Sequence, residues 1–202
     1  MSKGRLVIVS GPSGSGKDTI LKKVLSRMPE IKFSISSVTR DMREGEKEGE
    51  KYNFVSRQRF EEMIKNNELL EYNCYIGNYY GTPKAPVEQV IKNGGEIILE
   101  VDVNGQENIK KLVDSTISVF IMPPSFEVLR SRLSARGTDS KEVIDKRMDE
   151  ALAEIARAEN YDYIVVNDDL EQAVNDFINI IKIDRLSIER QNYLIDEVLK
   201  KC

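Results

Sequence analysis

The sequence predicts an α/β fold in which helices flank a central parallel sheet. Four short apolar runs have the length of buried strands, namely Leu6–Val9, Glu96–Val101, Ile117–Met122 and Tyr161–Val166. Helical patterns separate or follow these runs, and this alternation is typical of βα units around a parallel sheet. The 202 residues are 40% apolar and 32% charged, as in a soluble globular protein. A chain of this length buries a core without disulfides or a structural metal.

Apolar residues recur at helical spacing in several segments outside these runs. We expect helices over Thr19–Met28, from Phe126 to about Gly137, over Val143–Ile155 and in the C-terminal part from Leu170 onward. Asp139 and Glu142 form a candidate capping pair for the third helix. The C-terminal pattern predicts one long or broken helix that closes the fold.

Residues 34–86 interrupt the alternation of strands and helices. They combine short strand-like stretches, a charged loop at Arg40–Lys51 and one helical pattern near Gln58–Asn67. Pro83 and Pro86 mark the far boundary of this segment, because proline interrupts regular backbone pairing. We therefore expect a single domain over residues 1–202. Its core would comprise 1–33, 87–125 and 158–202, with a mostly β insertion at 34–86.

Composition and charge exclude several functional classes. The chain has no histidine, which removes His-assisted nucleophiles and His-ligated zinc. Its only cysteines, Cys74 and Cys202, are too few and too far apart for a disulfide framework, and they fit a reduced cytoplasm. With 30 basic and 34 acidic residues the net charge is −4, which argues against a broad nucleic-acid surface. No apolar run approaches the length of a membrane span, so we expect neither a nucleic-acid nor a membrane partner.

The strongest motif follows the first predicted strand. Gly11, Gly16 and Lys17 fit the pattern G-x-x-x-x-G-K, and a predicted helix comes next. In such a P-loop, backbone N–H groups and the helix N-terminus hold phosphate oxygens, and the lysine adds a full positive charge. The alternative is a Gly/Ser turn that only caps a helix. The predicted ATP-binding residues here are Gly11, Pro12, Ser13, Gly14, Ser15, Gly16, Lys17, Asp18 and Thr19.

Three acidic residues bear on a metal ion beside this loop. Asp18 occupies the position where a P-loop has the Ser or Thr that ligates magnesium, which makes it a further candidate ligand. Its carboxylate would also repel nucleotide phosphates in the absence of metal. Glu100 and Asp102 end an apolar strand, where α/β nucleotide-binding folds hold magnesium or its waters. The alternative for that pair is an ordinary turn after the strand.

Further motifs occur in the inserted segment and near the C-terminal part of the chain. Residues 34–46 read SISSVTRDMREGE, and Gly49 and YNFV at 52–55 follow. Leu70-Glu71, GNYYGT at 77–82 and VNDDL at 166–170 come next. Together with the P-loop, these motifs resemble the guanylate kinase family over about residues 5–175. The resemblance implies a P-loop kinase fold in which 34–86 is a GMP-binding subdomain and 126–157 a helical lid over ATP. The implied reaction is ATP + GMP → ADP + GDP with Mg²⁺, in purine nucleotide metabolism.

The resemblance also implies an acceptor site. Arg40, Arg43, Tyr52 and Tyr80 would hold the phosphate of GMP, using donors suited to an anion. Glu71 would accept from guanine N1–H and the 2-amino group, whereas adenine lacks both donors. Ser36 and Thr82 would complete the base contacts, with Thr82 donating toward O6. The full predicted set is Ser36, Arg40, Arg43, Glu46, Tyr52, Glu71, Tyr80, Thr82, Glu100 and Asp102, with Asp102 holding the metal through water. The alternative for the arginines is a solvated, mixed-charge loop.

The lid would supply further positive charge. Arg132 and Arg136 are four residues apart and so share one face of a helix, and Arg147 lies in the next helix. By resemblance, these arginines offset charge on the transferring phosphoryl group, together with Lys17 and Arg40 as catalytic residues. Asn167 would contact adenine. The alternatives are an ordinary charged helix surface for the arginines and a helix N-cap for the segment around Asn167.

One residue departs from the family pattern, and one other class of protein has the same fold. Glu100 replaces an aspartate of the family pattern, so its carboxylate is one methylene longer. Scaffold proteins also contain guanylate kinase-like domains that bind peptides and do not catalyse. Such a domain could dispense with Lys17 and the lid arginines, yet this chain retains them. The sequence therefore favours an enzyme acting on GMP and, less efficiently, dGMP.

Overall fold

The central layer of the molecule is a five-stranded, fully parallel sheet. A computed structural model describes residues 4–75, 77–135 and 140–200. The strand order is β2-β7-β1-β8-β9, and every neighbouring pair is parallel. The strands are β1 (Arg5–Ser10), β2 (Lys32–Phe33), β7 (Glu96–Glu100), β8 (Thr116–Met122) and β9 (Tyr163–Val166). The four predicted strands are confirmed, while β2 has too little apolar sequence to be foreseen.

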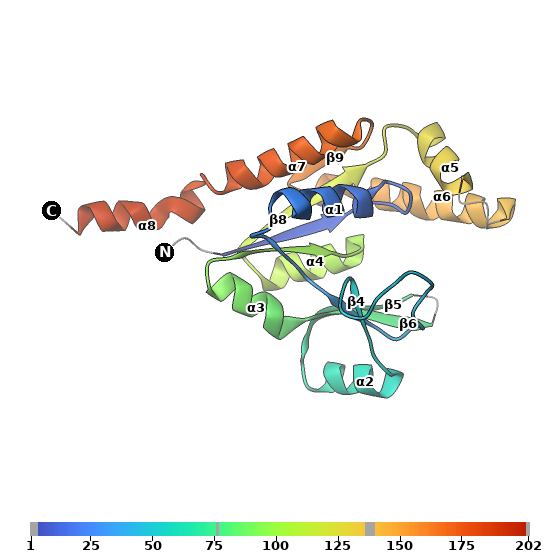
Figure 1. Cartoon of the computed structure of the whole chain (residues 1–202), viewed down its shortest axis with the longest axis horizontal. Coiled ribbons are helices and arrows are strands. Elements are labelled where there is room, and N and C mark those ends of the chain that lie inside the picture. Colours follow the sequence, from blue (N-terminus) through green and yellow to red (C-terminus); the bar gives the residue numbers. More distant parts are fainter. Residues whose placement is uncertain (1–3, 76, 136–139, 201–202) are drawn as a thin grey trace.

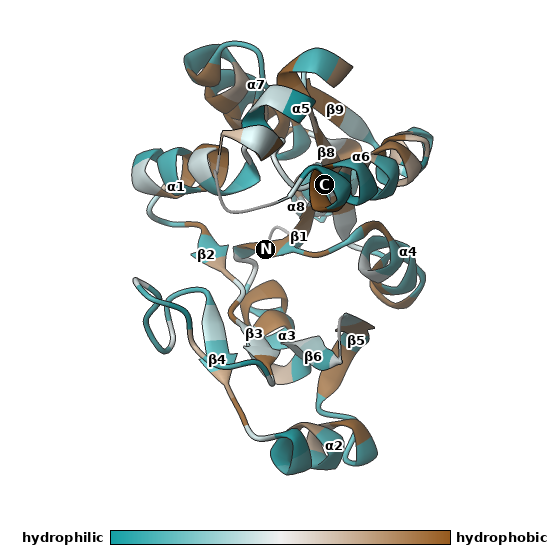
Figure 2. Ribbon diagram, turned by 90° about the vertical axis from the view of Figure 1, so that its right-hand side faces the viewer, coloured by the Kyte–Doolittle hydropathy of each residue, from teal (hydrophilic) through white to brown (hydrophobic). Residues whose placement is uncertain are grey.

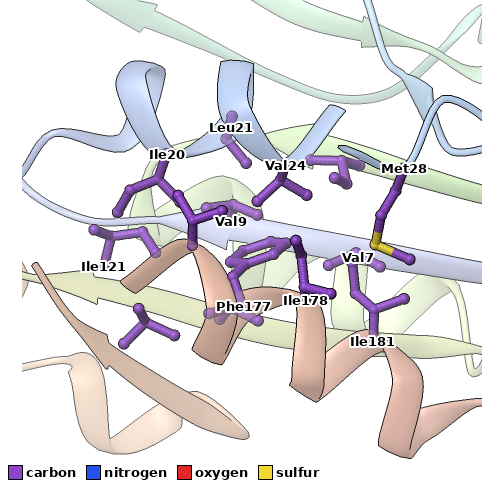
Figure 3. Packing of buried hydrophobic residues seen from close by; sticks show 14 of the residues in the cluster. Val7, Val9, Ile20, Leu21, Val24, Met28, Ile121, Phe177, Ile178 and Ile181 are labelled. Atoms are coloured by element: carbon purple, nitrogen blue, oxygen red, sulfur yellow. The ribbon is translucent and has the colours of Figure 1, made fainter. Parts of the chain in front are cut away.

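Alternation along β1 supplies both faces of this sheet with apolar side chains. Val7 and Val9 face the helices α1 (Lys17–Arg27) and α7 (Leu170–Asp184), where Phe177 is fully buried (Figure 3). Leu6 and Ile8 face the opposite way, toward α3 (Lys84–Lys92) and α4 (Val103–Leu112). A two-residue period is what the pleat of a strand produces. The sheet is thus buried on both sides, as its nearly continuous apolar strands predict.

Residues 34–86 contribute a second, smaller sheet, which lies beside the first as a separate layer (Figure 2). Its order is β4-β3-β6-β5, formed by β4 (Tyr52–Phe54), β3 (Ser36–Val38), β6 (Asn78–Pro83) and β5 (Leu69–Tyr75). The helix α2 (Arg57–Lys65) packs Phe60 and Met63 against Leu69. The mostly β character of this segment is confirmed. Pro86 does not mark a boundary, because it lies in the first turn of α3, where a helix tolerates a missing N–H.

Two helices lie near the carboxyl ends of the central strands. They are α5 (Phe126–Ser134) and α6 (Lys141–Ile155), and they pack on each other through Leu129, Leu133, Met148 and Ala151. The cap of α6 is Ser140, whose hydroxyl accepts from the backbone N–H of Val143. The predicted cap Asp139 and the predicted helix end at Gly137 lie outside the described residues, and α5 as described ends at Ser134.

The C-terminal segment is a broken helix. After α7, the chain turns and continues as α8 (Ile188–Leu199), which extends away from the body of the molecule (Figure 1). A short 3₁₀ turn, Ala158–Asn160, precedes β9. None of the helices in the described parts of the chain has the length and apolar character needed to cross a membrane.

Candidate active site

The P-loop connects the end of β1 to the start of α1, and its glycines are sterically required. Gly11 has φ 149° and Gly16 has φ 90°, a region that side-chain-bearing residues rarely adopt. A Cβ on Gly11 would lie 2.3 Å from the carbonyl oxygen of Ile121, and one on Gly16 would lie 2.2 Å from Asn167 Nδ2. The loop therefore packs against β8 and the end of β9 so closely that no side chain fits there.

Lys17 bends back over this loop. Its Nζ donates to the carbonyl oxygens of Gly11 at 2.5 Å and Pro12 at 3.4 Å. Burial lowers the pKa of Lys17, while the negative charges of Glu100 and Glu154 act in the opposite direction. The ammonium is thus held beside Gly11 and Pro12 of the loop. A nucleotide phosphate there would be a stronger acceptor than these neutral carbonyls.

Two of the three arginines predicted for the lid, Arg132 and Arg147, contact the P-loop or the residue beside it. Arg132 of α5 donates to the carbonyl oxygen of Asn167 at 2.9 Å and lies 3.5 Å from that of Ser15. Arg147 of α6 donates to Ser13 Oγ at 2.6 Å. The third predicted lid residue, Arg136, lies outside the described residues. Two helices that are distant in sequence from the loop thus bring positive charge to one phosphate-binding element.

A cavity of about 670 Å³ is lined by the P-loop, the smaller sheet and the helices α5 and α6. Seventeen of the predicted residues line it: Gly11, Pro12, Ser13, Gly14, Gly16, Lys17, Asp18, Thr19, Ser36, Arg43, Tyr52, Glu71, Tyr80, Glu100, Asp102, Arg132 and Arg147. Ser15, Arg40, Glu46, Thr82 and Asn167 are not part of its wall. The predicted phosphate-donor and acceptor residues therefore share one cavity.

Glu71 of β5 lines this cavity and is half-buried. Burial raises its pKa to about 7, with the charge of Asp102 acting in the same direction and a hydrogen bond from Thr82 opposing it. The hydroxyl of Thr82 donates to Glu71 Oε1 at 2.7 Å. That hydroxyl has one hydrogen, so in this structure it orients Glu71 and does not point to a position for guanine O6. The sequence did not indicate this use of Thr82.

The loop before β4 is organised by one bidentate ion pair. Both terminal nitrogens of Arg40 donate to Glu46, at 2.6 and 2.7 Å, and Glu46 also accepts from the backbone N–H of Arg43 at 2.8 Å. The hydrogen bond from Arg40 lowers the pKa of Glu46 to about 2. The guanidinium of Arg40 also lies 5.0 Å from the ring centroid of Tyr52. Arg40 thus shapes the loop that presents Arg43 and Tyr52 to the cavity.

The three acidic residues beside the P-loop all have partners. Asp102 caps α4 by accepting from the N–H of Gly105 at 2.8 Å, and its other oxygen accepts from Asn73 at 2.7 Å. Asp18 forms an ion pair with Lys51, and the same Nζ lies 2.9 Å from Glu100 Oε2. No cluster of three metal-binding side chains occurs within residues 4–75, 77–135 and 140–200. Protein groups alone therefore form no closed metal cage there.

Comparison with known proteins assigns the family. The family model described as Guanylate kinase matches residues 3–183. This chain belongs to the guanylate kinase family. A protein named guanylate kinase from Carboxydothermus hydrogenoformans is 48% identical over 195 residues, which cover 96% of this chain and 96% of that protein. One with the same name from Photorhabdus laumondii is 42% identical, covering 100% of this chain and 98% of its own length.

Solved structures give the same family and the same fold. The crystal structure of guanylate kinase from Anaplasma phagocytophilum has a TM-score of 0.79 and 32% sequence identity. The match covers 94% of this chain and 90% of that one. The predicted family and the P-loop kinase fold are thus confirmed.

The cavity of this family member is also lined by residues that the sequence-based prediction missed. Lys51, Asn73, Tyr75, Glu150 and Glu154 all line it. A signal was available for the α6 residues, because Arg147, Glu150 and Glu154 recur at helical spacing and so share one face. Lys51 gave no such signal, since it lies in a loop rich in both charges.

Proposed function

We propose that this chain transfers the γ-phosphoryl group of ATP to GMP, giving ADP and GDP. One observation carries the proposal: a single cavity is lined both by the P-loop with Lys17 and by the carboxyl of Glu71. The first group suits a nucleotide phosphate, and the second suits the two adjacent donors of guanine. Their common cavity would bring donor and acceptor phosphates together.

On the donor side, the residues act by position and charge. The backbone N–H groups of the P-loop would hold the β- and γ-phosphates, and Lys17 would exchange its contacts with Gly11 and Pro12 for phosphate oxygens. Arg132 and Arg147 already contact the loop, so they would offset negative charge as the phosphoryl group moves. The acceptor is an anionic phosphate oxygen, which needs no strong general base. A chain without histidine is therefore adequate for this transfer.

On the acceptor side, Arg43, Tyr52 and Tyr80 line the cavity and would bind the GMP phosphate. Ser36 and Glu71 would contact guanine. Adenine presents an acceptor at N1 and no 2-amino group, so it would leave the buried carboxyl unpaired. Sites built on such buried polar groups reject the wrong base by several orders of magnitude. We assign dGMP as a weaker substrate.

Magnesium fits the site as an ion held mainly by the substrate. Mg²⁺ retains waters and binds through one or two carboxylates together with phosphate oxygens. Both oxygens of Asp102 already accept hydrogen bonds, so we infer that it would hold the ion through water. When bound, the ion offsets the charge of the ATP phosphates. We also place the enzyme in the cytoplasm, in purine nucleotide metabolism.

The test is an assay of ADP release with magnesium over GMP, dGMP, AMP, CMP and UMP. We expect GMP to be best, dGMP weaker, and AMP poorer by about three orders of magnitude or more. Lys17→Ala should abolish most turnover with the fold unchanged by circular dichroism. No GMP-dependent ADP formation by the unaltered chain would contradict the proposal and favour a peptide-binding scaffold.

A further inference from the structure

Lys51 bridges the smaller sheet and the P-loop. It directly precedes β4, and its Nζ lies 2.9 Å from Glu100 Oε2 at the end of β7 while also contacting Asp18 in the first turn of α1. Among the ion pairs of the described residues, only these two join segment 34–83 to residues outside that segment. One ammonium therefore links the element proposed to bind the acceptor with two elements of the ATP site.

The ion pairs of Lys51 lie in the cavity that is proposed to hold the phosphates of both nucleotides. Lys51, Asp18 and Glu100 all line the cavity, and Lys51 Nζ is 5.7 Å from the ring centroid of Tyr52, a proposed phosphate ligand. Asp18 follows the P-loop lysine directly, where a neutral hydroxyl is usual. A free carboxylate there would repel a nucleotide phosphate. Lys51 supplies the opposite charge at that point.

We propose that Lys51 is a positioning residue that holds the acceptor-binding sheet against the P-loop and neutralises Asp18 and Glu100 beside the phosphates. This inference rests on the proposed function. It also explains how the chain tolerates an acidic residue directly after Lys17. The sequence alone predicts that Asp18→Ser tightens metal-free nucleotide binding. With Lys51 in place that repulsion is largely cancelled, so the tightening should appear mainly when Lys51 is removed.

The test compares Lys51→Met, Lys51→Arg, Asp18→Ser and the double variant Lys51→Met/Asp18→Ser in the full chain. We expect Lys51→Met to raise the KM for GMP about tenfold, since a charge-assisted contact is lost, and to change kcat much less. Lys51→Arg should restore most of the KM. Calorimetry of ATP binding in EDTA should show weaker binding by Lys51→Met, recovery in the double variant, and little change in Asp18→Ser alone.

Lys47→Met is the matched control. Lys47 lies on the same loop, its side chain is 74% exposed and it pairs with Glu50 within that loop. It should behave as the unaltered chain. If Lys51→Met left the KM for GMP and metal-free ATP binding unchanged, the inference would be overturned. It would also be overturned if the double variant bound metal-free ATP no more tightly than Lys51→Met. A chain that is inactive on GMP would contradict the proposed function. The role of Lys51 would still be tested, because the calorimetry of ATP binding needs no turnover.

Discussion

At the scale of single residues, Glu71 determines how binding should depend on pH. Guanine recognition requires the ionised carboxyl, because both guanine groups donate. Burial holds the pKa of Glu71 at about 7 in the free protein, so the binding-competent form is lost as the pH falls below that value. Well below that pKa, the affinity for GMP should therefore decrease about tenfold for each pH unit.

Calorimetry would measure this dependence between about pH 5.5 and about pH 8.5. These values lie about 1.5 units below and above the pKa of Glu71. Near pH 7, GMP binding should also release a proton, visible as a dependence of the enthalpy on the buffer. The phosphate of GMP titrates as well, with a pKa of about 6, and Glu71→Gln corrects for it because that variant retains only the ligand's titration. Equal pH slopes for both proteins would contradict the assignment of Glu71.

Gly105 provides the space that Glu71 occupies. A Cβ on Gly105 would lie 3.2 Å from Glu71 Oε2 and 3.0 Å from Val101 Cβ, closer than ordinary packing. Gly105→Ala should displace the carboxyl and raise the KM for GMP several-fold, with little change in the KM for ATP. Steady-state kinetics would measure both constants. Lys111→Ala, on an exposed part of the same helix, is the control and should change neither.

At the scale of elements, the start of helix α6 depends on its cap. Ser140 accepts from the N–H of Val143, one of the groups that a helix cannot pair internally. Ser140→Ala should destabilise the helix by about 1 kcal/mol. Hydrogen exchange should become faster in the first turn of α6, and stay unchanged in α1.

Ser134→Ala is the comparison for this cap. The Ser134 hydroxyl donates to the carbonyl of Arg130 within α5, and alanine has a higher helix propensity than serine. This variant should not accelerate exchange in α6. If both variants behaved alike, the Ser140 hydroxyl would not be an effective cap.

At the scale of the whole molecule, buried ion pairs attach the C-terminal helix to the central sheet. Arg190 of α8 lies 2.5 Å from Glu96 and 3.3 Å from Asp184, and Arg5 lies 2.9 Å from Asp184. All four side chains are buried. Arg5 and Glu96 are the first residues of β1 and β7, so this network lies at the amino-terminal ends of the strands. The cavity lies at their carboxyl-terminal ends, beside the P-loop.

Arg190→Met should therefore lower stability without altering catalysis. Removing one partner of a buried ion pair costs roughly 3–5 kcal/mol, while the KM for GMP should stay unchanged. Urea denaturation measures the free energy of unfolding. Arg27→Met removes an exposed pair with Glu171 and should cost less than about 1 kcal/mol. A similar loss in both variants would show that burial does not strengthen the Arg190 network.

Local spacing in the sequence is sufficient to predict several features of this protein. The strands β1, β7, β8 and β9 followed from short apolar runs, and the P-loop followed from Gly11, Gly16 and Lys17 between a strand and a helix. The break between α7 and α8 was left open, because both halves share one helical periodicity. Glu71 was proposed from a motif, yet its raised pKa depends on burial that no motif encodes.

Which polar and charged groups meet depends on the tertiary structure. Lys51 pairs with Asp18 and Glu100, which are distant in the sequence and come from two other elements. Arg40 pairs with Glu46 outside the cavity wall, and Thr82 donates to Glu71. Charged side chains carry no periodic signal that would indicate such partners. The contacts of Lys51 depend on how the two sheets are placed relative to each other. Apolar packing also contributes to that placement, since Leu70 of β5 lies in one cluster with Leu6 and Leu99 of the central sheet.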